Sequence, residues 1–137
     1  MKFQQIDSTD QKLIEAAKEI LQKNYHPIRH SVGAAVLCSS GKIYTGINIE
    51  ASGYGPCAEP IAIGAAFTSG ERKILTVVAI SKDRDGYTVH SPCGNCRQLL
   101  MDYAPDAMII FRYEAKVLKT KVSNLLPGAY ISDFDNA

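Results

Sequence analysis

Three cysteines in two short segments constrain this chain more than any other feature of its sequence. The first segment is Cys57-Ala58-Glu59, and the second is Pro92-Cys93-Gly94-Asn95-Cys96. Three thiolates are enough to hold a zinc ion, because catalytic zinc sites typically have three protein ligands and leave the fourth position to water. We therefore predict one Zn²⁺ per chain, with Cys57, Cys93 and Cys96 as its ligands.

An acidic residue, Glu59, follows the first of these cysteines by two positions. If Cys57 begins a helix, Glu59 points in a different direction from Cys57 and is poorly placed to be a fourth ligand. It is better placed to move the protons of a water molecule whose pKa zinc lowers toward neutrality. The sequence therefore predicts a zinc hydrolase with Glu59 as its catalytic residue.

Length and composition narrow the class of protein. A chain of 137 residues predicts a single domain over residues 1–137. The 15 basic and 14 acidic residues form no basic run, so we expect no nucleic-acid partner. No apolar stretch resembles a signal peptide or a membrane span, so we expect a cytoplasmic protein with no membrane partner. There, clustered cysteines stay reduced and more often bind metal than form disulfides.

Local patterns predict an α/β fold. Ser8 and Gln11 have the spacing of a capping box and should begin a helix that ends near Asn24. Residues 32–38 and 43–47 predict a β-hairpin, in which Cys38 is a buried, small hydrophobic residue. Further helices are expected at 57–69 and 93–103, strands at 74–80, 108–111 and 117–122 (an edge strand), and a polar loop at 82–88.

This order of elements predicts a three-layer α/β/α sandwich around a mixed sheet of about five strands. Both cysteine segments then lie at helix N-termini, each of which contributes roughly half a positive charge. That charge should lower the pKa values of the thiols and offset part of the negative charge of a zinc–thiolate site. Arg97, directly after Cys96, is the cation expected to offset the rest, and an ordinary surface arginine is the alternative.

The two segments together resemble the cytidine deaminase superfamily, in the branch of small homotetrameric cytidine deaminases and blasticidin S deaminases. The resemblance rests on Cys57-Ala58-Glu59 combined with Ser91-Pro92-Cys93-Gly94-Asn95-Cys96-Arg97-Gln98, and extends from about Val32 to Tyr130. It implies hydrolytic deamination of a cytosine nucleoside, cytidine or deoxycytidine, to the uracil nucleoside and ammonia. Glu59 would carry protons between the attacking water, the pyrimidine ring and the leaving ammonia.

The resemblance also implies which residues hold the substrate. Asn48 and Glu50 match residues that bind the sugar hydroxyls, and the backbone around Ala58 and Ser91 would hold the pyrimidine edge. His30 stands where cytidine deaminases usually carry a phenylalanine that contacts the base.

A C-terminal segment, Leu125-Leu126-Pro127-Gly128-Ala129-Tyr130, matches the homotetrameric members, with Tyr130 in place of the usual phenylalanine. In that family the segment helps to cover the site of a neighbouring subunit, which implies a homo-oligomer, a homotetramer. Packing at the end of a strand is the alternative role of this segment.

Two features favour blasticidin S as an alternative substrate with the same mechanism. The loop from Glu50 to Cys57 is shorter than is usual in cytidine deaminases and resembles that of fungal blasticidin S deaminases. Pro60 stands where members of the superfamily commonly have arginine.

Two other classes of function remain open from the residues alone. Cys93-Gly94-Asn95-Cys96 resembles a thioredoxin-type redox pair, although that reading gives Cys57 and Glu59 no role. A structural zinc-binding module would need a fourth ligand. Only Cys38 and His90 could supply one, and we expect His90 to be a packing residue.

Overall fold

The computed structural model describes residues 3–134 and contains one mixed sheet with helices on both faces. In chain order the elements are β1 (Gln4–Gln5), α1 (Ser8–Asn24), β2 (Val32–Cys38), β3 (Ile43–Ile47), α2 (Ala58–Thr68), β4 (Ile74–Asp83), β5 (Gly86–Val89), α3 (Gly94–Tyr103), β6 (Met108–Tyr113), β7 (Lys116–Lys121) and the 3₁₀ helix η1 (Val122–Leu125). Within residues 3–134, no helix is long and apolar enough to cross a membrane.

The long strand β4 organises the sheet, whose order is β1-β7-β6-β4-β2-β3. Along one edge β4 pairs with β2 in antiparallel register. Along the other edge, its first half pairs in parallel with β6, at Thr76 and Val77, and its second half pairs with β5 from Ile80 to Asp83. The predicted mixed sheet is confirmed, with seven strands rather than about five.

The two additional strands are short and carry no apolar run. β1 has two residues, both exposed, and pairs with β7, so β7 is not the edge strand that we expected. β5 lies in the segment predicted to be a polar loop, and that prediction is wrong. Gly86, with φ +113°, follows the tight turn after β4, and backbone pairing rather than apolar composition then defines the strand.

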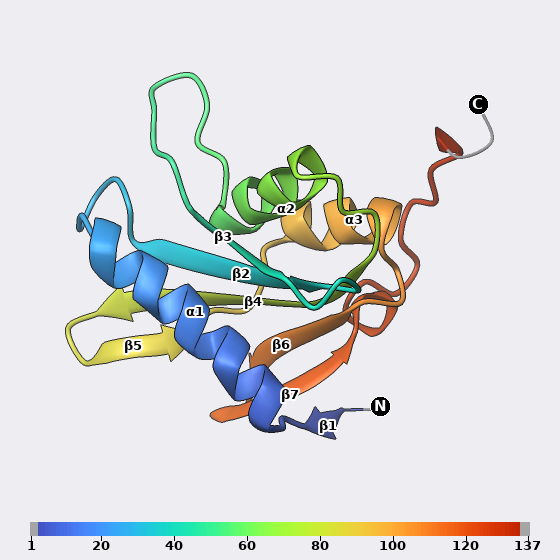
Figure 1. The fold of residues 1–137 in the computed structure, drawn as a ribbon, viewed down its shortest axis with the longest axis horizontal. Coiled ribbons are helices and arrows are strands. Elements are labelled where there is room, and N and C mark those ends of the chain that lie inside the picture. The colour runs from blue at the N-terminus through green and yellow to red at the C-terminus, as the bar shows by residue number, and fades with distance from the viewer. Residues whose placement is uncertain (1–2, 135–137) are drawn as a thin grey trace.

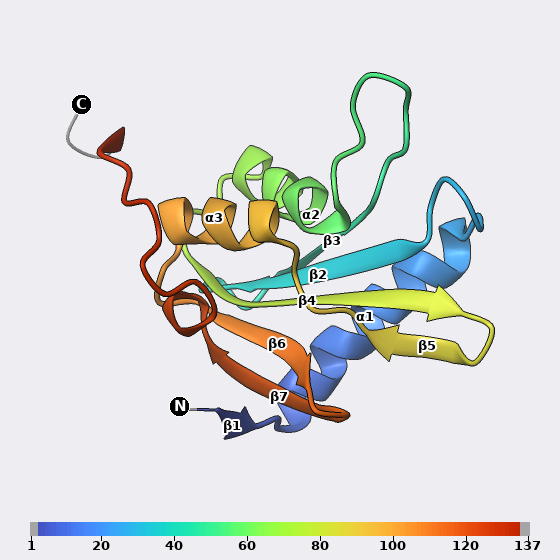
Figure 2. The same ribbon diagram turned by 180° about the vertical axis from the view of Figure 1, so that it is seen from behind.

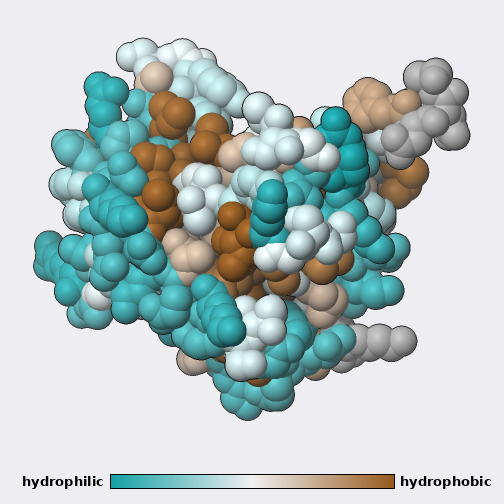
Figure 3. Space-filling view, viewed as in Figure 1, coloured by the Kyte–Doolittle hydropathy of each residue, from teal (hydrophilic) through white to brown (hydrophobic). Residues whose placement is uncertain are grey.

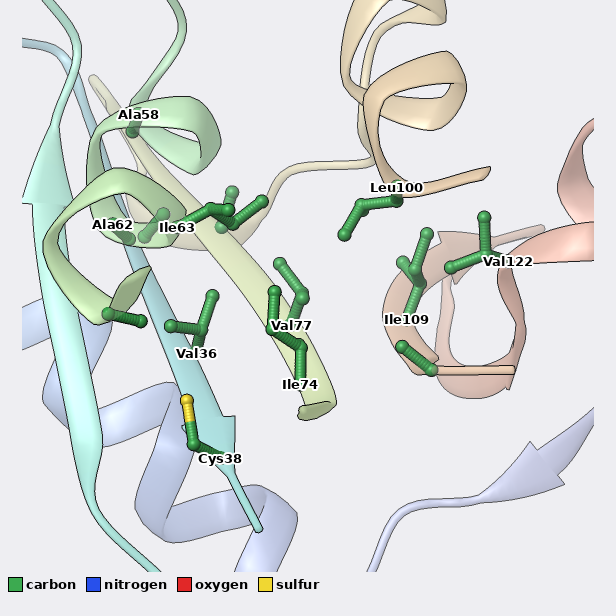
Figure 4. Close-up of a cluster of buried hydrophobic side chains, with 14 of the residues drawn as sticks. Val36, Cys38, Ala58, Ala62, Ile63, Ile74, Val77, Leu100, Ile109 and Val122 are labelled. Carbon is green, nitrogen blue, oxygen red and sulfur yellow. The ribbon is translucent and has the colours of Figure 1, made fainter. Parts of the chain in front are cut away.

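The helices form two layers on opposite faces of the sheet. α1 lies on one face, and α2 and α3 lie side by side on the other (Figures 1 and 2). Buried side chains fill both interfaces. The layer under α2 and α3 includes Cys38 and Leu100 (Figure 4), and the layer under α1 includes Leu13 and Val78. This arrangement confirms the α/β/α sandwich, and Cys38 is the buried hydrophobic residue that we expected.

Two glycines allow the helices to approach the sheet closely. A Cβ atom at Gly33 of β2 would lie 2.6 Å from the carbonyl oxygen of Ala17 in α1. A Cβ atom at Gly46 of β3 would lie 2.6 Å from the backbone nitrogen of Ala62 in α2. Both distances are shorter than non-bonded atoms tolerate, so only glycine allows these helix–strand contacts.

The N-terminus of α1 is capped one residue earlier than predicted. Asp7 is the N-cap, its Oδ1 accepts from the N–H of Asp10, and the N–H of Asp7 donates to Asp10 Oδ2, each at 2.9 Å. The predicted pair Ser8 and Gln11 is therefore wrong, although the helix ends at Asn24 as expected. The aspartate pair is favoured because Lys119 of β7 reaches it, with its Nζ 2.7 Å from Asp10 Oδ2 and 3.2 Å from Asp7 Oδ2.

Removing the positive charge of Lys119 should destabilise the fold. Lys119→Met leaves the buried Asp10 carboxylate without its cation, which costs about 3 kcal/mol of unfolding free energy. Lys121→Met is the matched control, because Lys121 makes one exposed, 3.7 Å ion pair with Asp106 and should contribute less than about 1 kcal/mol. Urea unfolding of both variants measures the difference, and equal losses would contradict this account.

Candidate active site

The three predicted zinc ligands come together at the N-termini of two helices. Cys57 and Cys93 are the N-cap residues of α2 and α3, both with extended backbone, and Cys96 lies in the first turn of α3. The Sγ atoms of Cys57 and Cys93 are 3.5 Å apart, and those of Cys93 and Cys96 are 3.4 Å apart. All three sulfur atoms lie within 4.8 Å of one another.

These sulfur positions fit a zinc ion. Tetrahedral coordination with Zn–S bonds of about 2.3 Å places the sulfur atoms about 3.8 Å apart. Across the described residues 3–134, no further Cys, His, Asp or Glu joins the cluster, and Cys38 is buried in the core. The cluster can therefore hold one zinc ion with a position left open for water.

The three thiols differ in their pKa values in the absence of metal. Burial raises the pKa of Cys57 and of Cys96 above the usual thiol value. Burial also acts to raise the pKa of Cys93, but hydrogen bonds from the backbone N–H of Cys96 and from neighbouring thiols hold it below the usual value. The lowering expected at helix N-termini thus occurs only at Cys93. Metal binding releases the protons of the other two thiols.

Glu59 lies in the first turn of α2 with only 3% of its surface exposed. Burial raises the pKa of its carboxyl group above the usual value. Hydrogen bonds from its own backbone N–H and from Cys96, together with the attraction of His90, act in the opposite direction. A carboxyl group whose protonated form is favoured by burial is suited to take up and release a proton during a reaction.

A cavity of about 140 Å³ lies beside the cysteine cluster. It brings together most of the side chains and backbone that the sequence singled out. Its lining residues are Ser31, Val32, Asn48, Glu50, Gly55, Cys57, Ala58, Glu59, His90 and Cys93.

Asn48 is buried between the cavity and the start of β2. Its Oδ1 accepts hydrogen bonds from the N–H groups of Ser31 and Val32, at 2.9 and 3.0 Å. Its Nδ2 donates to Glu50 Oε1 at 3.4 Å, and Glu50 itself is exposed. These bonds fix the direction of the amide group, with its NH₂ donors on the side of Glu50.

Three predicted substrate contacts are absent from the cavity lining. His30 Nδ1 hydrogen-bonds the carbonyl oxygen of Asn48 at 2.9 Å, so its ring supports the loop behind the cavity. Tyr130 is exposed on the C-terminal segment. The side chain of Ser91 hydrogen-bonds the backbone of Arg112, donating to its carbonyl oxygen at 3.2 Å and accepting from its N–H at 3.1 Å.

Arg97 binds backbone carbonyl groups on either side of the N-terminus of α3. Its Nε donates to the carbonyl oxygen of Pro92, and a terminal nitrogen donates to that of Leu125, both at 2.9 Å. The side chain therefore joins the segment before Cys93 to the C-terminal region. Its predicted role in offsetting thiolate charge stays a prediction.

His90 lines the cavity, whereas the sequence analysis considered it only as a possible fourth zinc ligand and expected it to pack. It is exposed rather than packed, contrary to our expectation. Strand alternation could have identified it, because Val89 before it is buried under α1 and the next side chain points to the opposite face.

Comparisons with known proteins agree with this site. Residues 7–112 match the sequence model of the family described as cytidine and deoxycytidylate deaminase zinc-binding region. A blasticidin-S deaminase from Bacillus cereus is 38% identical over 137 aligned residues, covering 95% of this chain and 98% of its own. A cytidine deaminase from Sporosarcina psychrophila is 39% identical, covering 88% and 90%.

Solved structures show the same relationship. The crystal structure of cytidine deaminase from Burkholderia pseudomallei superposes with a TM-score of 0.74 at 31% identity, covering 88% of this chain and 98% of that one. The predicted resemblance is confirmed, and the chain belongs to the cytidine and deoxycytidylate deaminase family of zinc-dependent hydrolases.

Proposed function

We propose that this chain hydrolyses the 4-amino group of a cytosine nucleoside, cytidine or deoxycytidine, to give the uracil nucleoside and ammonia. The observation that carries the proposal is a single cavity that joins two kinds of group. Glu59 and the cysteine cluster lie at one part of its lining, and Asn48 and Glu50 lie at another. The first part has the groups needed to activate water and transfer protons, and the second has polar groups that can bind the hydroxyl groups of a sugar.

Zinc held by Cys57, Cys93 and Cys96 would supply a water molecule activated for attack at neutral pH. Glu59 would accept a proton from this water and deliver it to N3 of the pyrimidine. It would then take the remaining proton of the hydroxyl group added at C4 and deliver it to the leaving amino nitrogen. The burial of Glu59 supports this role, since a raised pKa brings its proton affinity closer to that of the groups it serves. The oxygen of water replaces the amino nitrogen, which leaves as ammonia.

The rest of the cavity would orient the substrate. The free NH₂ donor of Asn48 and the carboxylate of Glu50 are placed to bind sugar hydroxyl groups. The backbone of Ala58 lines the cavity next to Glu59 and is suited to hold the edge of the pyrimidine. Ser91 would contribute through its backbone, because its side chain is occupied by Arg112.

We also infer that the active form is a homo-oligomer, a homotetramer, in the cytoplasm. α2 is apolar on most of its sides, and the apolar side chains of Tyr130, Ile131 and Phe134 are exposed on a C-terminal segment that leads away from the body (Figure 1). Figure 3 shows further apolar patches across the middle of one face.

The volume of the cavity also points to a second subunit. It is smaller than roughly 300 Å³, the lower end of the volumes usual for small-molecule binding sites. A second subunit would complete it, and a reducing compartment would keep the thiols available to zinc.

Blasticidin S is the second candidate substrate, since it too is a cytosine joined to a sugar ring. The Bacillus cereus relative at 38% identity and the short loop from Glu50 to Cys57 favour it. The presence of Asn48 and Glu50 in the cavity favours a nucleoside with free sugar hydroxyl groups.

Each of the three clustered cysteines should be required for zinc. We expect about one zinc per chain in the wild-type protein and in Cys38→Ala, and a large loss of zinc in Cys57→Ser, Cys93→Ser and Cys96→Ser. Metal analysis of the purified variants measures this. Loss of zinc from Cys38→Ala equal to the loss from the other variants would rule out the three-thiolate site.

Glu59→Gln should bind zinc and fold but turn over very slowly. The variant keeps the size and hydrogen-bonding capacity of the side chain and removes its proton transfer, which typically contributes about 10²–10⁴-fold. Steady-state kinetics with cytidine, together with zinc analysis of the same sample, test this. A kcat that retains a tenth of the wild-type value would exclude Glu59 as the proton carrier.

Glu50→Ala should reduce kcat/KM for cytidine at least about tenfold, because a hydrogen bond to a charged group contributes about 1.5–3 kcal/mol. Glu19→Ala, an exposed glutamate of α1 outside the cavity, is the control and should leave kcat/KM unchanged. Ammonia release from cytidine, deoxycytidine, free cytosine and blasticidin S is followed in parallel. A wild-type preference for blasticidin S, or cytidine turnover that does not respond to Glu50→Ala, would overturn the nucleoside assignment.

A further inference from the structure

His90 differs from the other two histidines in having its ring free to meet a ligand. Nδ1 of His26 accepts from the N–H groups of Ile28 and Arg29, and Nδ1 of His30 bonds the carbonyl oxygen of Asn48. No residue between 3 and 134 hydrogen-bonds the ring of His90. Within that part of the chain, His90 also provides the only aromatic ring in the lining of the active-site cavity.

Hydrogen bonds hold the backbone in place on both sides of His90. His90 follows β5 directly, and its N–H donates to the carbonyl oxygen of Ala79 in β4 at 2.8 Å. On the other side, the side chain of Ser91 is bonded twice to the backbone of Arg112 in β6. Because Val89 packs under α1, strand alternation directs His90 to the opposite face, where α2 and α3 lie.

The ring also lies near the catalytic carboxyl group. His90 and Glu59 both line the cavity, and the two side chains are close enough to interact electrostatically. A proton can pass from Glu59 to a pyrimidine only if the two are within hydrogen-bond reach. The base of a bound nucleoside must therefore occupy the space that His90 borders.

We propose that His90 is a specificity-determining residue whose imidazole ring packs against the cytosine ring of the substrate. This rests on the proposed deamination of a cytosine nucleoside. It assigns to His90 the contact with the base that the sequence had suggested for His30. The contribution is to binding of the base and not to proton transfer, so it holds for any substrate that carries cytosine.

The test compares His90→Ala with His90→Phe in the zinc-loaded enzyme. Calorimetry with uridine, which has a pyrimidine ring and cannot be deaminated, measures binding without turnover. Loss of a base–aromatic contact should weaken uridine binding about 5- to 150-fold in His90→Ala, while the flat ring of His90→Phe should keep it within about threefold of wild type. KM for cytidine should rise in His90→Ala and stay close to the wild-type value in His90→Phe, and kcat should change much less in both variants.

His26→Asn is the matched control, because asparagine can accept the same two backbone N–H groups and His26 lies outside the cavity. It should bind uridine as the wild type does. All variants should retain zinc, which is measured on each sample.

Three results would overturn the proposal: unchanged uridine binding in His90→Ala, equal weakening in His90→Phe and His90→Ala, or loss of zinc from His90→Ala. An enzyme that deaminates blasticidin S and not cytidine would instead refute the nucleoside assignment. In that case the same variants are compared through KM for blasticidin S, and the same pattern is required.

Discussion

The chemistry of this protein depends on two helix N-termini that meet above one face of the sheet. Cys57 caps α2 and Cys93 caps α3, and their sulfur atoms come within 3.5 Å although the residues lie far apart in sequence. Without metal this places three thiols together, two of them with raised pKa values caused by burial. A zinc ion bound to the three sulfur atoms would stabilise their ionised forms, and it would link the N-termini of α2 and α3.

Asn48 connects the stability of the fold with the shape of the site. Its side-chain Oδ1 accepts hydrogen bonds from the backbone N–H groups of Ser31 and Val32 at the start of β2, and its side-chain Nδ2 donates to Glu50. His30 and Arg29 tie the same stretch from the other side, through the carbonyl oxygens of Asn48 and Glu50. The proposed sugar-binding residues are thus held by the hydrogen bonds that join two loops, and their positions are set before a ligand arrives.

The sequence predicted the parts of the structure that local patterns determine. The cysteine segments, the hairpin at 32–47 and the helices carry their own spacing or apolar periodicity, so they could be placed without tertiary information. β1, β5 and the Asp7–Asp10 cap could not, because each depends on a partner strand or on Lys119 rather than on its own composition. His30 shows the same limit in the site, since its residue type does not reveal that its ring is bonded to the backbone carbonyl oxygen of Asn48.

The contact at Gly46 has a consequence for how enzymes of this shape change over evolutionary time. The backbone of α2 lies directly against β3 there, because Gly46 has no side chain to separate them. Any larger residue at position 46 would push away the helix that carries Glu59, so the glycine sets the distance between Glu59 and the sheet. The mouth of the cavity is less constrained, because residues 50–55 form an exposed loop that does not pack under α2. Changes in that loop could alter which substrate is bound, while the positions of Glu59 and of the cysteines stayed the same.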